Sequence, residues 1–226
     1  NGLKDELVKN RIDILKINTT QAEKDLFVKL DKLGYNYYLL GAQIEYKAVF
    51  KKNVNTKFRN SQIKIIEYKG GDANVLKTLV KDVFKNNYSS YFQNPGIIGL
   101  VDDKTQLDCF AEYILTLNSA NKENHFTHLF YLDNILVGFI CSYVDGIGSG
   151  ALYSGILKKY ENRGLYLDII QFIQAFGKEK GSKWGTATVQ LQNIVGQKSF
   201  IAGGMSPNGY SLNIHINAFE GIECKT

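Results

Sequence analysis

A loop that can bind an anion lies at residues 160–165 and reads Tyr160-Glu161-Asn162-Arg163-Gly164-Leu165. It falls between a predicted strand and a predicted helix. The first N–H groups of a helix have no partner inside it, and the helix dipole favours negative charge there. Gly164 lets the backbone approach a phosphate closely, and Arg163 adds a positive charge. The loop is a candidate phosphate site, although an ordinary turn explains an Arg-Gly pair by itself.

A second segment of interest follows the next predicted strand. It contains Asn193, Gly196 and Phe200, and it ends at Gly204-Met205. Alone, this spacing predicts a short helix over 193–202 that ends at a pair of glycines.

Three other patterns do not favour chemistry. His125 and His128 lie three apart on a predicted strand, where alternate side chains point to opposite faces, so they do not predict a metal pair. The glycines of 146–150 join two strands, whereas a dinucleotide fingerprint requires a strand followed by a helix. The sequence also contains no Walker A ending and no Gly-x-Ser-x-Gly elbow.

The elements that must position these residues alternate along the chain. From residue 62 the apolar spacing predicts the order β-α-α-β-β-β-α-β-α-β, with strands over 151–157 and 184–191 and a helix over 165–180. Residues 1–60 predict a small β-α-β-β lobe whose last two strands cover 37–40 and 44–50. The expected division is therefore a lobe over 1–60 and a larger domain over 61–226.

The composition narrows the class of protein. The 226 residues are 44% hydrophobic and carry a net charge of +5, which suits a globular chain and gives either solubility or attraction for polyanionic small molecules. No apolar run reaches the ~20 residues of a membrane span, and the polar start does not match a signal peptide. Three scattered cysteines indicate a cytoplasmic protein without a disulfide framework. No block of basic residues resembles a nucleic-acid-binding arm.

Taken in order, the two segments resemble the GNAT superfamily of acyl-CoA-dependent N-acyltransferases. In that family an R/Q-x-x-G-x-G/A loop binds the CoA pyrophosphate, and an N-x-x-A-x-x-x-Y-x-x-x-G-F segment packs beside the pantetheine. Gly164 matches the central glycine, and Asn193 and Gly204 fit the second segment. Three residues depart from the pattern: Glu161 replaces Arg or Gln, Tyr166 replaces a small residue, and Phe200 replaces the proton-donating tyrosine.

A narrower resemblance covers the whole chain. Arg11-Ile12-Asp13, Lys32-Leu33-Gly34-Tyr35 and Ile44-Glu45-Tyr46 are similar to the N-terminal lobe of the TDP-fucosamine acetyltransferase group. Ser89-Ser90-Tyr91 and residues 213–217 are similar to that group's substrate loop and last strand. The resemblance implies an acceptor that is a dTDP-linked amino-dideoxy sugar used for O-antigen or lipopolysaccharide, and it is compatible with a homodimer.

The resemblance also implies a fold, a mechanism and a site. The fold is α/β (α+β), with a mixed central sheet whose middle strands splay. The amine attacks the thioester directly, so acyl-CoA is the co-substrate and no metal is needed. The implied CoA-binding residues are Gly155, Ile156, Leu157, Asn162, Arg163, Gly164, Leu165, Tyr166, Asn193, Gln197 and Phe200. Among them a backbone N–H of 155–157 polarises the carbonyl oxygen, and Asn193 bonds to pantetheine or to nearby backbone.

Two sets of residues complete the expected site. The candidates for the missing acid are Tyr153, Tyr166 and His215, for each of which packing or surface exposure is the competing interpretation. The candidates for acceptor binding are Tyr88, Ser89, Tyr91, Asn94 and His215.

Alternatives remain open. The acyl group is acetyl or a longer chain such as 3-hydroxybutanoyl. The acceptor is alternatively a protein amine or a polyamine, which acidic pocket residues would favour. The chain is alternatively an acyl-CoA-binding module without catalysis, as Phe200 suggests.

Overall fold

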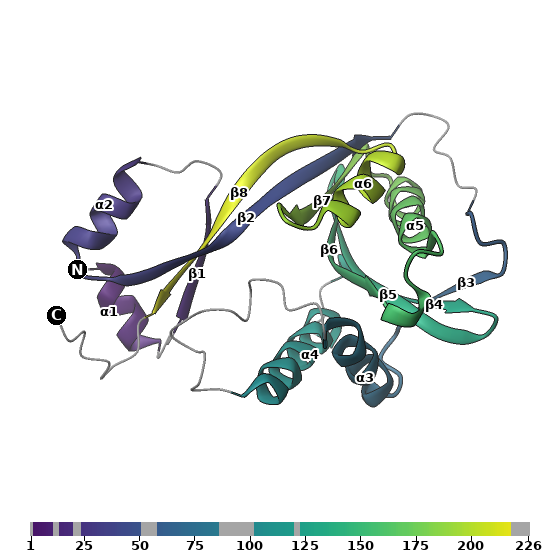
Figure 1. Cartoon of the computed structure of the whole chain (residues 1–226), viewed down its shortest axis with the longest axis horizontal. Coiled ribbons are helices and arrows are strands. Elements are labelled where there is room, and N and C mark those ends of the chain that lie inside the picture. The colour runs from purple at the N-terminus through teal and green to yellow at the C-terminus, as the bar shows by residue number, and fades with distance from the viewer. Residues whose placement is uncertain are drawn as a thin grey trace.

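The described strands form one mixed sheet in the order β1-β8-β2-β7-β6-β5-β4-β3 (Figure 1). A computed structural model describes residues 2–10, 14–19, 24–50, 58–85, 102–119 and 123–217. The strands are β1 Ile14–Thr19, β2 Asn36–Val49, β3 Ile63–Glu67, β4 His125–Leu132, β5 Ile135–Asp145, β6 Gly148–Ile156, β7 Trp184–Gln190 and β8 Ser206–Asn217. All neighbours pair antiparallel except β6 and β7, which are parallel.

Helices cover both faces of this sheet. They are α1 Gly2–Lys9, α2 Lys24–Lys32, α3 Ala73–Phe84, α4 Asp103–Ser119, α5 Leu165–Glu179 and α6 Ile194–Ala202. The order of elements from β3 onwards is the predicted one. Asp72 caps α3 as a residue of its type should, since its carboxylate accepts from the Asn74 N–H at 2.9 Å.

Two apolar layers hold the helices to the sheet. On one face α3 and α4 bury Leu76, Val80 and Ile114 against Phe139 of β5. On the other face α5 buries Leu165, Ile169 and Ile173 against strands β4 to β6. Figure 1 shows the two pairs, α3 with α4 and α5 with α6, on opposite sides of the strands.

The N-terminal part of the chain differs from the predicted β-α-β-β arrangement in two respects. A helix that was not predicted, α1, precedes β1. The two strands expected at 37–40 and 44–50 are one strand, β2, which continues through Gly41 with a register shift. β2 lies between β8 and β7 and pairs with both, so residues far apart in the sequence share one sheet. The strand continues through an irregularity between Leu39 and Gly41, where Gly41 takes a φ of 145° that a glycine readily adopts. A domain boundary near residue 60 stays a prediction.

Candidate functional site

The central feature is the divergence of the two parallel strands. β6 and β7 are paired only over Gly148–Ala151 and Trp184–Ala187, although β6 continues to Ile156 and β7 to Gln190. The Leu157 N–H donates to Val137 O at 2.8 Å, so it faces β5. Successive residues of a strand direct their N–H groups to opposite edges. The N–H groups of Ser154 and Ile156 therefore point towards β7, where the described strands offer them no ladder partner.

The loop that follows β6 presents a helix N-terminus beside this divergence. After a 3₁₀ turn at Lys158–Tyr160, Asn162 and Gly164 take left-handed backbone angles, with φ of 61° and 77°. Gly164 is the N-cap of α5 and contributes no side-chain cap. The Leu167 N–H donates to Gly164 O at 3.1 Å, so the N–H groups of Leu165 and Tyr166 are the ones that the first turn of α5 offers to an anion.

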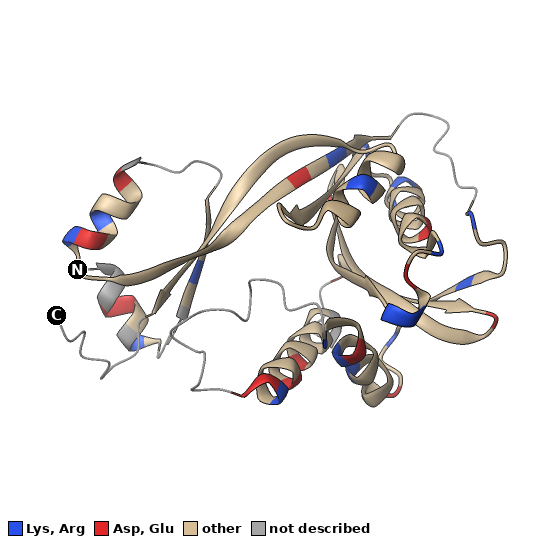
Figure 2. Ribbon diagram, in the orientation of Figure 1, with Lys and Arg blue, Asp and Glu red and all other residues tan. Residues whose placement is uncertain are grey.

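The charge around this loop is mainly positive. Lys158, Lys159 and Arg163 are basic, and Glu161 is the one acid among residues 158–164. Figure 2 shows these charges where the chain passes from β6 to α5. The Arg163 guanidinium lies over the Tyr160 ring, 5.2 Å from its centroid. The balance favours a phosphate-bearing ligand over a cationic one.

A segment that sequence reasoning missed lies against the same loop. The fully buried Asp168 carboxylate accepts from Arg59 N and Asn60 Nδ2, each at 2.6 Å. Asn60 Nδ2 also donates to Arg163 O at 3.2 Å. A Cβ added at Gly164 would lie 3.1 Å from Arg59 Cδ. Arg59 thus joins the basic residues of the loop, through contacts between residues more than 100 positions apart that no local pattern reveals.

Tyr166, in the first turn of α5, faces the divergent end of β6. Its hydroxyl lies 3.2 Å from Ser154 Oγ. Burial raises the pKa of Tyr166, and the bond to Ser154 lowers it to a smaller extent. The ring is 6.2 Å from that of Phe200, between centroids. The protonated hydroxyl of Tyr166 therefore lies near Phe200, whose side chain has no hydroxyl.

Phe200 is buried in a cluster that includes a strand from the N-terminal segment. Its ring lies 5.2 Å from that of Tyr46 in β2, and the Tyr46 hydroxyl donates to Gln197 Oε1 at 3.4 Å. Gln197 Nε2 donates to Leu191 O at 2.6 Å. Gln197 therefore ties α6 to β2 and to the residue that follows β7.

Asn193 is the N-cap of α6. Its Oδ1 accepts from the Gly196 N–H at 2.9 Å. The Asn193 side chain was expected to bond either to pantetheine or to nearby backbone, and the structure shows the bond to nearby backbone. A Cβ at Gly196 would lie 2.8 Å from Val189 Cγ2, so a glycine brings α6 close to β7.

Tyr153 lies on the opposite side of the sheet from Tyr166. Its ring packs edge-on against Phe110 and Tyr113 of α4, with centroids 5.3 and 5.9 Å away. A Cβ at Gly155 would meet Val83 Cγ1 of α3 at 2.2 Å, which explains the glycine by packing. The two tyrosines therefore flank β6 from different faces.

His215 is not brought to either tyrosine. It lies in β8, opposite Tyr38 of β2 and Lys16 of β1. Tyr38 is five residues from Gln43, the partner of the last residue of β7, which is about 17 Å along a strand. The other expected acceptor residues, Tyr88, Ser89, Tyr91 and Asn94, lie outside the described residues.

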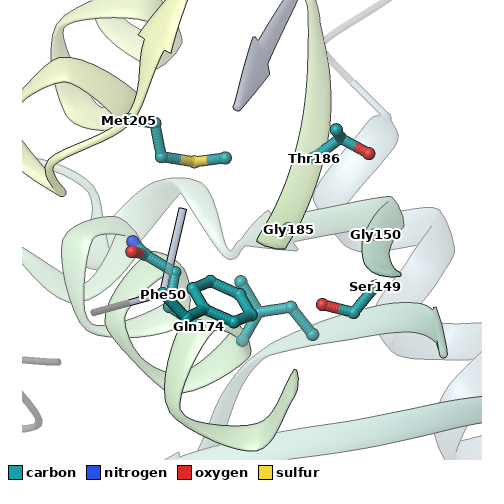
Figure 3. Close-up of a pocket in the computed structure, with 8 residues that line it drawn as sticks. Phe50, Ser149, Gly150, Gln174, Gly185, Thr186 and Met205 are labelled. Atoms are coloured by element: carbon teal, nitrogen blue, oxygen red, sulfur yellow. The ribbon is translucent and has the colours of Figure 1, made fainter. Parts of the chain in front are cut away.

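A small cavity lies at the paired ends of β6 and β7 and does not form part of this site. Phe50, Ser149 and Met205 are among the side chains around it (Figure 3). Its volume is about 10 Å³, which holds at most one water molecule. Among the described residues no group of three or more His, Cys, Asp or Glu gathers as metal ligands. None of the described helices is long and apolar enough to cross a membrane.

Solved structures share this architecture at low sequence identity. A functionally unknown conserved protein from Staphylococcus epidermidis superposes with a TM-score of 0.63 and 14% identity, over 96% of this chain and 79% of its own. A GCN5-related N-acetyltransferase from Sphaerobacter thermophilus gives 0.63 and 12%, over 98% and 68%. A tandem GNAT protein from the clavulanic acid biosynthesis pathway gives 0.64 and 6%, over 97% and 69%. No family model and no curated protein matches the sequence. The chain has the GNAT fold, as predicted.

Proposed function

We propose that this chain, which has the GNAT fold, is an N-acyltransferase that moves an acyl group from acyl-CoA to the amine of a nucleotide-linked amino sugar. One observation carries the proposal: β6 and β7 diverge after Ala151 and Ala187, beside the uncapped N-terminus of α5. Strand N–H groups that have no ladder partner among the described strands therefore lie next to an anion site. A ligand with a diphosphate at one end and a thioester at the other matches both.

The coenzyme site is proposed along the loop and the first turn of α5. Backbone N–H groups of residues 162–166 would bind the diphosphate, and Arg163 and Arg59 would supply charge. The left-handed Gly164 keeps Cβ atoms away from the phosphate oxygens. Because Glu161 stands where the family pattern has Arg or Gln, the contact of this position with the diphosphate would differ from the usual one. Phe200 and Gln197 would wall the pantetheine on the α6 side.

The chemistry needs two groups from the protein. The Ile156 N–H, directed away from β5, would donate to the carbonyl oxygen as the acceptor nitrogen attacks. The Leu157 N–H cannot, because it is bonded to Val137 O. As the new C–N bond forms and the C–S bond breaks, the Tyr166 hydroxyl would protonate the leaving thiolate. A thiol has a pKa of about 8.5, so this assistance is helpful but not indispensable.

The acceptor is proposed to enter from the α3–α4 side, where Tyr153 lies. Its amine loses its extra proton to solvent after attack. The proposed acceptor is a dTDP-linked amino-dideoxy sugar that serves a surface polysaccharide such as O-antigen, and the proposed compartment is the cytoplasm. The acyl group is acetyl or 3-hydroxybutanoyl, and a homodimer is compatible with this site.

A second acceptor class is favoured by one observation. A groove of about 400 Å³ along α3 is lined by Asp72 and Asp82 and extends to Leu157 at the end of β6. Two carboxylates there would attract a cationic protein amine or polyamine instead of a sugar nucleotide. Because Phe200 has no hydroxyl where a proton donor is usual, an acyl-CoA-binding module without catalysis is a further rival.

Calorimetric titration with CoA, followed by thiol release from acetyl-CoA and 3-hydroxybutanoyl-CoA, tests the proposal. We expect CoA to bind and thiol to be released with dTDP-linked amino-dideoxy sugars. Turnover with spermidine instead would move the assignment to the cationic class. Binding of CoA without release with any amine would leave the binding module, and a lack of CoA binding would refute the proposal.

A further inference from the structure

The Tyr166 side chain lies across the gap between the divergent ends of β6 and β7. Its ring packs against two apolar clusters at once. One cluster contains Ile156 of β6, and the other contains Val189 of β7 and Phe200 of α6. In Figure 1 both helices, α5 and α6, lie on one side of these strands. The ring therefore fills the divergence from the side that α5 and α6 cover.

The Tyr166 hydroxyl fixes the ring at one point along β6. It lies 3.2 Å from Ser154 Oγ. Ser154 stands between Ala151, the last residue of β6 that pairs with β7, and Ile156, whose N–H is the proposed donor to the thioester carbonyl. Ser154 and Ile156 are two residues apart, about 7 Å along a strand. The ring thus stands between the proposed carbonyl site and the narrow end of the divergence.

The other face of β6 offers no room beside Gly155. This residue follows Ser154 in the strand and faces α3, where a Cβ would meet Val83 Cγ1 at 2.2 Å. Val83 is itself buried, so it packs directly on the strand backbone at this point. An acyl chain that continued past Ser154 would therefore meet Val83 on one side and the Tyr166 ring on the other.

The direction of the acyl chain follows from the proposed contacts of the thioester. The loop that would bind the diphosphate follows β6 at the wide end of the divergence, so the sulfur would lie towards that end. The carbonyl carbon is trigonal, and its oxygen would accept from the Ile156 N–H. The acyl chain, its third substituent, would then be directed away from the sulfur, towards Ser154 and the narrow end. Each added methylene would bring the chain closer to the Tyr166 ring.

The ring takes up space that the family pattern leaves open. The GNAT loop has Gly or Ala at the position of Tyr166. A small residue there cannot reach Ser154, whereas the tyrosine both reaches it and packs on the cluster around Phe200. A pocket that does not fit one extra methylene discriminates against it by about 10–200-fold. The size of this residue is therefore expected to decide which acyl group fits.

We propose that the Tyr166 ring sets the upper limit on the length of the acyl group, so that the protein accepts an acetyl group and rejects butanoyl and 3-hydroxybutanoyl groups. The inference rests on the proposed acyltransferase function, and it separates two roles of one side chain. The hydroxyl is the proposed acid, and the ring is the specificity determinant. Loss of the hydroxyl alone therefore leaves the length limit in place.

Titration calorimetry with CoA, acetyl-CoA and butanoyl-CoA tests the proposal without an acceptor. Tyr166→Phe keeps the ring and removes the hydroxyl, whereas Tyr166→Ala removes both. Tyr166→Leu is a milder reduction for the case in which the alanine variant does not fold. Val83→Ala is the matched control, because it removes a buried side chain from the other face of β6. Thermal melts show whether each variant is folded.

We expect wild type, Tyr166→Phe and Val83→Ala to bind butanoyl-CoA at least about tenfold more weakly than acetyl-CoA. Tyr166→Ala and Tyr166→Leu should bind the two acyl-CoAs within about threefold of each other. Equal affinities of wild type for both, or a preference that Tyr166→Ala and Tyr166→Leu retain in full, overturns the length limit and leaves the acyltransferase proposal standing. A Val83→Ala protein that loses the preference overturns the placement of the chain against Tyr166. A wild-type protein that binds none of the three ligands refutes the acyltransferase proposal itself, and the length limit with it.

Discussion

Replacement of Tyr166 by Phe separates a catalytic hydroxyl from a structural one. The change removes one hydrogen bond, that between the hydroxyl and Ser154 Oγ at 3.2 Å. Such a bond contributes about 1 kcal/mol to stability, which lowers the melting temperature by about 2–4 °C in a chain of this size. A general acid contributes ~10²–10⁴-fold to rate. If Tyr166 is that acid, the loss in turnover far exceeds the loss in stability.

The assay compares thiol release, CoA affinity and melting temperature in the same preparation. We expect Tyr166→Phe to lower kcat by about two to four orders of magnitude and to leave CoA affinity within about twofold. Tyr160→Phe, in the loop before α5, is the control for a tyrosine hydroxyl that performs no chemistry. Burial raises the pKa of Tyr166. The wild-type rate should therefore fall at a higher pH than it would if the acid were an exposed tyrosine, whose pKa is about 10. A kcat of Tyr166→Phe within threefold of wild type would refute the role.

Three further predictions concern the anion loop and the core. Gly164→Ala forces an alanine into a left-handed conformation and places its Cβ 3.1 Å from Arg59 Cδ, so titration calorimetry should show weaker CoA binding and denaturation a loss of about 1–2 kcal/mol in the free energy of unfolding. The control Gly34→Ala, at a φ of 71° with open space around it, should lose the same stability and bind CoA normally. Equal CoA affinities of the two variants would contradict the loop assignment. Asp168→Ala removes the charged acceptor of three hydrogen bonds from residues 59 and 60, so urea denaturation should show a loss of about 3 kcal/mol in the free energy of unfolding together with weaker CoA binding. An unchanged midpoint would show that Asp168 does not hold the segment there. Burial lowers the pKa of His128 from 6.5 to about 4, so its neutral form contributes stability above pH 6.5 that is lost as the pH falls to 4, about 3 kcal/mol in total. Denaturation at pH 7 and pH 4.5 should show most of this loss in wild type and little in His128→Leu, and the same pH dependence in both proteins would exclude His128 as its source.

From β3 onwards the order of helices and strands was determined by the sequence alone, because local rules suffice for it. The apolar period predicts α5, and the N-cap residues Asp72 and Asn193 mark the starts of α3 and α6. The loop around Gly164 could also be recognised, since glycine and a following helix are adjacent in the chain. These features depend on residues a few positions apart, where sequence and structure are closely coupled.

The partners across the sheet were decided only by the tertiary structure. No local pattern shows that β2 inserts between β8 and β7, or that Asp168 binds the 59–60 segment. The strand expected to break near Gly41 continues, because pairing on both edges outweighs a weak local turn signal. Likewise Tyr153, Tyr166 and His215 were equivalent candidates in the sequence, and their positions on two faces and on a distant strand follow from register. Long-range pairing sets register, and a single residue of shift exchanges the two faces of a strand.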